Sequence, residues 1–386
     1  MKRRLTNLTN LTNSLLGLPL FAALNPRSQD NGDGTGVLVG REPTGLASPG
    51  APRGPDWAQA SPAWIASALG AALGKDGGGW YVLDRREAFA GEGPWRMEVH
   101  GQVLAVWRDA DKQLLAAPEA CPHLGAALTS GRVVAGRLVC PWHGLRLDGR
   151  GFRNWRCHPV HDDGLLIWVQ LQTPGESLSD APIIAPRPVA GVAATIATHI
   201  RCDPQDVLAN RLDPWHGAHF HAHSFGALQV LERTLDEVRL RVVYRVVGPI
   251  GVEVDATFHC PDPRTIVMTI IDGDGVGSIV ETHATPIAPG RTMLVETTIA
   301  NSDRPVFGWL RKVPLIERLL QPLIEGRARK LWVDDVVYAE RRYALRLAAA
   351  TPKLVPNQPM SSQGLRQDGE AWTEGPRVIS ERRPHR

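Results

Sequence analysis

Two cysteine–histidine pairs constrain the fold of this chain more than any other feature. The segment CPHLGAALTSGRVVAGRLVCPWHG places Cys121 two residues before His123, and Cys140 three residues before His143. A stretch of hairpin length separates the pairs, so two adjacent loops can bring two thiols and two imidazoles to one point. A tetrahedral zinc site accepts the same set of donors. However, a zinc finger usually pairs Cys with Cys and His with His, and its setting is less rich in strands, Gly and Pro.

This segment resembles the Rieske domain, in which CxH and CxxH pairs hold a [2Fe–2S] cluster. The resemblance extends to the Pro after each cysteine and to Gly125 and Gly144 after the two pairs. It implies that the two cysteines bind one iron and the two histidines bind the other. Neutral imidazoles in place of two thiolates raise the reduction potential of such a cluster, which suits it to accept an electron from a ferredoxin.

A second group of metal-binding side chains lies in DPWHGAHFHAHSF, residues 213–225. On helical spacing alone, His216, His219 and His223 share one face, because positions i, i+3 and i+7 align. This spacing favours a site of three histidines and leaves His221 outside it.

The wider segment NRLDPWHGAHFHAHSF resembles the N-x-x-D-x-x-H-x(4)-H signature of Rieske non-haem iron oxygenases. The resemblance matches Asn210 and Asp213 to the first two positions of the signature. It makes His216 and His221 the ligands of a mononuclear Fe(II), so a helix must bend or end between them. The other histidines are then surface groups or lie behind the ligands.

The third iron ligand is expected from the late part of the chain, where WVDDVVYAERR offers Asp334 and Asp335. The family pattern has an acidic residue, an aspartate, four further residues and then Glu or Gln, and it selects Asp335. The alternative is that both aspartates belong to a solvated acidic helix face. Two histidines and one carboxylate leave positions on Fe(II) open for oxygen beside a substrate.

The resemblance also gives Asp213 a part in electron transfer. In the family, the carboxylate at this position bridges a cluster histidine of one subunit to an iron histidine of the next, which implies a homotrimer. A simple cap of the helix that begins near Pro214 would satisfy Asp213 equally well.

Periodicity and composition divide the chain into four parts and predict an α+β fold. The parts are an N-terminal extension with one helix, a small all-β Rieske domain, a catalytic domain and a disordered tail, over residues 1–77, 78–175, 185–350 and 351–386. Ser61 is the expected cap of the first helix. In the catalytic domain, antiparallel strands precede a helical region that Pro322 and Gly326 are expected to interrupt. The resemblance implies a helix-grip (START-like) sheet for this domain.

Composition bears on partners and compartment. The 43 basic and 40 acidic residues nearly cancel, to a net charge of +3, so no nucleic acid partner is expected. Five cysteines, an odd number, indicate a reducing compartment and hence the cytoplasm. Basic residues before LLGLPLFAAL, residues 15–24, have the rough layout of a signal peptide. We discount this interpretation because the run contains Gly17 and Pro19 and is too short to span a bilayer, but contact with a membrane surface stays an alternative.

Together these features predict the terminal component of an oxygenase. It would use the cluster, Fe(II) and O2 to hydroxylate or otherwise oxidise an apolar substrate, such as an aromatic, steroid, terpenoid or pigment-like molecule. The sequence has no GxGxxG motif, so a separate ferredoxin, an NAD(P)H-dependent reductase or both would supply electrons. Two alternatives stay open: a Rieske electron-transfer protein, and an apolar-ligand-binding protein whose mononuclear site does not function.

Overall fold

The computed structural model describes residues 60–350 except 190, 222–223, 248–249 and 302–313. Most of the expected N-terminal extension, the run at residues 15–24, the expected tail and His223 therefore lie outside the described residues. The chain separates into a unit Met1–Arg346 and a unit Leu347–Arg386, and the features below belong to the first, apart from residues 347–350 at the end of the last helix. The four-part division of the chain stays a prediction.

Three small antiparallel sheets form the region that carries the cysteine–histidine pairs. Their strand orders are β1-β9-β8, β2-β3-β4 and β5-β6-β7. The strands are β1 Trp80–Arg85, β2 Trp95–Val99, β3 Gln102–Arg108, β4 Leu114–Pro118, β5 Arg132–Val134, β6 Arg137–Val139, β7 Arg146–Leu147, β8 Val160–Asp162 and β9 Leu166–Gln170, with short 3-10 turns at Arg86–Phe89 and Leu128–Ser130.

Strand β3 separates two hydrophobic cores of this region. Side chains alternate across a strand, so Leu104 and Val106 join one core and Ala105 and Trp107 join the other. The second core also contains Cys121 and Cys140. Both cysteines are therefore anchored from behind by packed apolar side chains.

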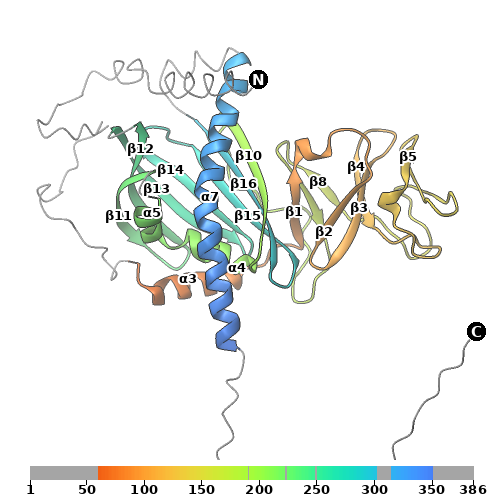
Figure 1. The fold of residues 1–386 in the computed structure, drawn as a ribbon, viewed down its shortest axis with the longest axis horizontal. Coiled ribbons are helices and arrows are strands. Elements are labelled where there is room, and N and C mark those ends of the chain that lie inside the picture. Colours follow the sequence, from red (N-terminus) through yellow and green to blue (C-terminus); the bar gives the residue numbers. More distant parts are fainter. Residues whose placement is uncertain (1–59, 190, 222–223, 248–249, 302–313, 351–386) are drawn as a thin grey trace, which may run out of the picture. The chain divides into compact units, whose positions relative to one another are not determined.

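One seven-stranded antiparallel sheet follows, in the order β10-β16-β15-β14-β13-β12-β11 (Figure 1). Its strands are β10 Val192–Ile200, β11 Phe225–Arg233, β12 Glu237–Val247, β13 Ile250–Asp262, β14 Thr265–Gly273, β15 Ile279–Ala288 and β16 Arg291–Ala300. Strand β12 shows the alternation that builds it: Val238, Leu240 and Val242 are buried, whereas Arg239 and Arg241 bind Asp255 on the other face.

Within the described residues, four helices accompany the sheet. They are α3 Pro62–Leu73, α4 Pro204–Arg211, α5 Pro214–Phe220 and α7 Pro314–Ala350. Ser61 caps α3, as expected, by accepting a hydrogen bond from the Trp64 N–H at 3.3 Å. Asp203 and Asp206 form a capping box at the start of α4. No helix in the described ranges is long and apolar enough to cross a membrane.

Helix α7 is continuous, so the expected interruption at Pro322 and Gly326 is wrong. A proline inside a helix removes one backbone hydrogen bond and costs about 3 kcal/mol. Packing offsets this cost, because Ala328, Trp332 and Ala339 lie in the main core of the large sheet. The helix crosses the sheet in front of α4 (Figure 1), and it places its buried side over the residues discussed next.

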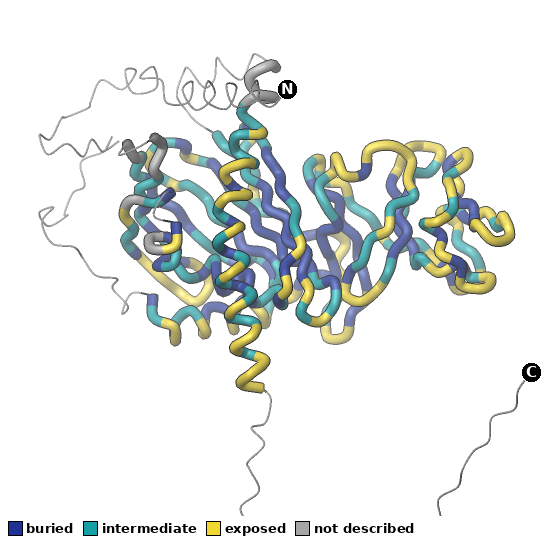
Figure 2. The backbone as a smooth tube through the Cα atoms, viewed as in Figure 1, coloured by how far each residue is buried: buried dark blue, intermediate teal, exposed yellow. Residues whose placement is uncertain are grey.

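Buried polar contacts join the strands before residue 175 to the large sheet. The guanidinium of Arg187 donates two hydrogen bonds to Glu281, both at 2.7 Å, and one to Asp163 at 3.0 Å. The hydroxyl of Thr285 donates to the Val82 carbonyl at 2.8 Å. Burial continues along the strands on both sides of this junction, whereas the connecting loops are mostly exposed (Figure 2).

Candidate active site

The two cysteine–histidine pairs occupy two loops of matching geometry. In each loop the cysteine N–H donates to the carbonyl five residues on, and the glycine N–H four residues on donates back to the cysteine carbonyl, at 2.8 to 3.0 Å. Gly125 and Gly144 have φ angles of 78° and 69°. These left-handed angles favour glycine, which accounts for its place after each pair.

The four side chains in these loops fit a [2Fe–2S] cluster. Both cysteines are buried, while the Nδ1 atoms of the exposed His123 and His143 face each other at 3.3 Å. Burial raises the pKa of Cys121. For Cys140 burial also opposes ionisation, but the N–H groups of Trp142 and His143 outweigh it and lower the pKa of the thiol. Two buried thiols at one side and two imidazole nitrogens at the other match the donor set of a Rieske centre.

Helix α5 positions the first pair of iron-ligand candidates. Asp213 caps it by accepting from the N–H groups of Trp215 at 3.0 Å and His216 at 3.4 Å. The helix ends at Phe220, and His221 follows with φ −111° and ψ 39°. The expected end of a helix between His216 and His221 is therefore observed, and it turns both rings toward one point.

Asp335 of α7 completes this group. Its Oδ1 atom lies 3.1 Å from His216 Nε2 and 2.8 Å from His221 Nε2. The three potential ligand atoms all lie within 4.8 Å of one another. Two imidazole nitrogens and one carboxylate oxygen are the donor set of a non-haem Fe(II) site. The structure thus brings the three predicted ligands together, while their role as ligands stays a prediction.

Unsatisfied polar atoms support a bound ion at this point. Asn210 donates to Asp335 Oδ1 at 3.0 Å and lies 3.3 Å from His216 Nε2. Asn210 Oδ1 and Asp335 Oδ2 are buried and accept no hydrogen bond within the described part of the chain. Buried polar atoms of this kind are rare and often mark an ion or water. Burial alone would raise the pKa of Asp335, but the hydrogen bonds from both histidines lower it, which keeps a carboxylate here.

The second aspartate, Asp334, takes a different position. Its Oδ2 atom lies 3.5 Å from His221 Nδ1, on the side of the ring away from Asp335, and its side chain is 39% exposed. A carboxylate behind a ligand histidine fixes the ring orientation. The geometry therefore favours Asp335 over Asp334 as the ligand.

Asp213 contacts the site through two different groups. Its backbone carbonyl accepts a hydrogen bond from His216 Nδ1, and its Oδ2 atom accepts one from the Tyr338 hydroxyl at 3.2 Å. The carboxylate also forms the helix cap that sequence analysis kept as the simpler alternative. Its predicted role between subunits stays a prediction.

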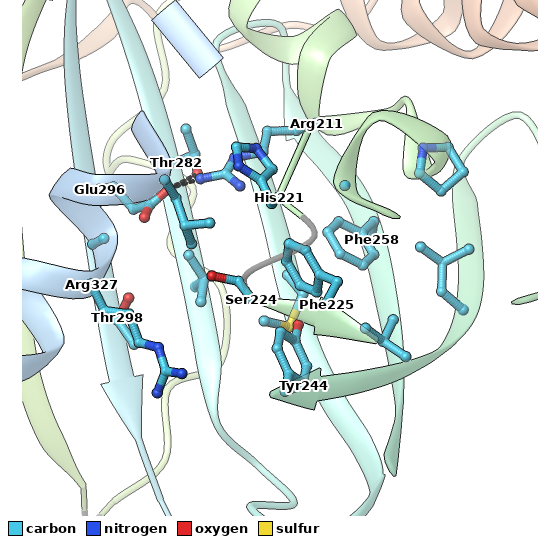
Figure 3. A pocket seen from close by; sticks show the side chains of 18 of the residues that line it. Arg211, His221, Ser224, Phe225, Tyr244, Phe258, Thr282, Glu296, Thr298 and Arg327 are labelled. Atoms are coloured by element: carbon cyan, nitrogen blue, oxygen red, sulfur yellow. Dashed lines mark hydrogen bonds and ion pairs between the residues drawn. The ribbon is translucent and has the colours of Figure 1, made fainter. Parts of the chain in front are cut away.

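A cavity of about 360 Å³ adjoins His216 and His221. Its walls come from the large sheet and from α7 and are mostly apolar, among them Phe225, Leu228, Leu240, Val242, Tyr244, Phe258, Ile266, Met268, Val280, Ile324 and Leu331. Figure 3 shows His221 above Phe225 and Tyr244, with Arg211 and Glu296 nearby. This volume and lining suit a small apolar ligand.

An ion pair that the sequence did not predict lies at the metal end of this cavity. The guanidinium of Arg211 binds Glu296 and lies 3.8 Å from Asp335 Oδ2. It also lies over the Trp332 ring, 4.6 Å from its centroid. The available signal was Glu296 itself, because it is the one charged residue in TMLVETTIA, a stretch whose residues are otherwise apolar or uncharged and mostly buried.

Two family models match successive parts of the chain. Residues 79–161 match the model of the Rieske [2Fe–2S] domain, and residues 173–350 match a domain of unknown function, DUF5914. Similar proteins include the 4beta-methylsterol monooxygenase of Methylococcus capsulatus, 35% identical over 91 residues, which are 24% of each chain. The oxygenase component of dicamba O-demethylase from Stenotrophomonas maltophilia is 30% identical over 37% of this chain and 46% of its own.

The fold agrees with these matches. The structure of dicamba monooxygenase bound to dicamba superposes with a TM-score of 0.56 and 21% identity, over 73% of this chain and 91% of that one. The chain is a homologue of the Rieske non-haem iron oxygenases. This confirms the family and the α+β fold inferred from the sequence. The chain spans less than half the length of these curated relatives in the alignments.

Proposed function

We propose that this chain is the terminal oxygenase component of a Rieske non-haem iron system and oxidises an apolar organic substrate. The observation that carries this proposal is the convergence of His216, His221 and Asp335 beside an apolar cavity. A [2Fe–2S] cluster supplies single electrons, and Fe(II) supplies the capacity to activate O2.

The residues of this chain provide the setting for that chemistry. The buried thiols would hold one iron of the cluster, and His123 and His143 would hold the other. Because these two imidazoles are exposed, electrons would have a short route to the cluster. At the other centre, two histidines and one carboxylate would occupy one side of Fe(II). The apolar walls, including Phe225 and Val242, would exclude water and hold the substrate beside the open side.

Asp213 and a trimer belong to the same proposal. Asp213 is tied to His216 through its backbone carbonyl, so a cluster histidine of a neighbouring subunit that reached its carboxylate would be connected to the iron ligand. The Tyr338 hydroxyl donates to that carboxylate and holds it in place. We accordingly propose a homotrimer in which each iron centre receives electrons from the adjacent subunit.

Separate proteins would supply the electrons. We propose a ferredoxin, an NAD(P)H-dependent reductase or both as partners, because relatives are named as oxygenase components or subunits. The five cysteines are all free, which supports a reducing compartment, and we propose the cytoplasm.

Metal analysis tests the proposal against its two alternatives. Anaerobically purified protein should contain about three irons and two acid-labile sulfides per chain, as expected for a Rieske cluster plus one Fe(II). The substitution Asp335→Ala should remove one iron and leave the sulfide unchanged, whereas Cys140→Ser should remove the cluster. About two irons for two sulfides, even after Fe(II) is added, would leave an electron carrier or a ligand-binding protein.

A further inference from the structure

A group of polar side chains lies at the metal end of the apolar cavity. Arg211, Glu296 and Thr282 line this end together with His216 and His221. Arg211 joins the two charges, since it binds Glu296 and approaches the iron-ligand candidate Asp335. A molecule in the cavity would therefore place its apolar body against the sheet and meet the Arg211–Glu296 pair near the metal, with the charged side chain of Arg327 further away from His221 (Figure 3).

Glu296 uses one of its two carboxylate oxygens for every hydrogen bond that it accepts from the described residues. Its Oε2 atom accepts hydrogen bonds from Arg211, from Thr282 Oγ1 at 3.0 Å and from Trp332 Nε1 at 2.8 Å. The Oε1 atom accepts none from any residue that the structure describes. A carboxylate has about four lone-pair sites, so Oε1 keeps its full capacity to accept in a residue that lines the cavity (Figure 3).

An ion pair with only a structural role would contribute little to stability at this buried position. Replacing a buried ion pair by packed apolar side chains is often neutral or stabilising. A well-placed polar group in an otherwise apolar site, in contrast, fixes the orientation of a ligand. The three donors on Oε2 hold the carboxylate in place and leave Oε1 able to accept from a further donor.

We propose that the substrate carries a hydroxyl or amine donor on an otherwise apolar body, and that Glu296 Oε1 accepts this hydrogen bond and orients the substrate at the metal end. The inference rests on the proposed function, since it takes the cavity as the substrate site. Substrates in this class include phenols, hydroxylated terpenoids or sterols and aromatic amines, whereas pure hydrocarbons and fully etherified molecules fall outside it.

Equilibrium binding to the anaerobic, cluster-containing protein tests this inference. The probes are 4-cyclohexylphenol, 4-cyclohexylaniline and the methyl ether of the phenol, titrated by calorimetry. A hydrogen bond to a charged acceptor contributes about 1.5–3 kcal/mol, so the two donors should bind about tenfold or more tightly than the ether. The variant Glu296→Gln should lose most of this preference.

Thr298→Val is the matched control, because Thr298 lines the same cavity from the same strand. It should keep the wild-type preference for the donors. The inference would be overturned if the wild-type protein bound the phenol and its ether equally, or did not bind the phenol saturably. It would also be overturned if Glu296→Gln kept the preference for donors or if Thr298→Val lost it. If Glu296→Gln does not fold, the ratio of the wild-type affinities for the phenol and its ether still tests the inference, because equal affinities would overturn it.

These measurements use neither oxygen nor a reductase. A missing mononuclear iron would contradict the proposed function while leaving the affinity ratio measurable. Failure of the donor preference in a protein with three irons would contradict only the inference about the substrate.

Discussion

Asp334 and Asp335 are neighbours in the sequence but contact opposite nitrogens of the same imidazole. Asp335 Oδ1 lies 2.8 Å from His221 Nε2, and Asp334 Oδ2 lies 3.5 Å from His221 Nδ1. One turn of helix α7 therefore supplies both a candidate ligand and the group behind a second ligand.

This arrangement predicts different effects for the two aspartates. Asp334→Asn should weaken Fe(II) binding about 10- to 100-fold, because it removes the charge that orients His221. Asp335→Asn should abolish tight binding. Chelator competition with Fe(II) measures both. Glu340→Gln is the control, because Glu340 is an acidic residue of the same helix that pairs with Arg201, and it should leave the Fe(II) affinity unchanged. An unchanged Fe(II) affinity in Asp334→Asn would contradict the role assigned to Asp334.

The cluster loops predict that two cysteines differ sharply in their importance. Cys140→Ser should eliminate the visible absorption of the cluster and its sulfide. Cys157→Ser should retain both, because burial raises the pKa of Cys157 to about 11 and keeps its thiol protonated outside the two loops. Absorption spectra and sulfide assays distinguish these outcomes, and cluster loss in Cys157→Ser would show that the four-ligand assignment is incomplete.

The Asp213 contacts predict a defect in electron transfer rather than in assembly. Asp213→Asn should lower turnover with a surrogate reductase about 10- to 100-fold while three irons per chain remain. Single-turnover reduction of the cluster by dithionite should proceed as in the wild type. Tyr338→Phe removes only the hydroxyl that donates to the carboxylate and should have a smaller effect. Normal turnover in Asp213→Asn would exclude the proposed bridge.

The Arg187 contacts predict a pH-dependent contribution to stability. Burial raises the pKa values of Asp163 and Glu281, but hydrogen bonds from Arg187 outweigh it, so both pKa values lie below their usual 3.8 and 4.5. The unfolded chain therefore binds protons first as pH falls, and this contribution is present above about pH 4.5 and lost below it.

Arg187→Met should lower the free energy of unfolding at pH 7 by about 3 kcal/mol, because it leaves two buried carboxylates without their cation. The deficit should shrink as pH falls below the usual carboxyl pKa values. Denaturant unfolding at several pH values measures this change. Arg86→Met removes an exposed arginine paired with Asp162 and should have little effect at any pH. If the loss in the free energy of unfolding had the same size at every pH, it would come from packing rather than from charge.

The sequence predicted the two cluster loops because their backbone geometry is local. Helical spacing, in contrast, grouped His216 with His219 and His223, and this reasoning fails because α5 ends at Phe220. The family resemblance included His221 because its pattern records the end of the helix. The pairing of Arg211 with Glu296 could not be predicted, since it joins residues 85 positions apart through the sheet. The continuity of α7 past Pro322 depends in the same way on packing that local propensity does not contain.

Helix α7 combines two tasks along its length. The three apolar wall positions of α7 are Ile324, Ala328 and Leu331, while Asp335 lies one turn further on. Beyond it, Arg346 is held by Asp203 and Asp206 at the start of α4. The cavity wall, the candidate metal ligand and the anchored end thus follow one another along a single helix. A mutant library confined to the three wall positions therefore offers a way to redirect substrate choice without rebuilding the metal centre.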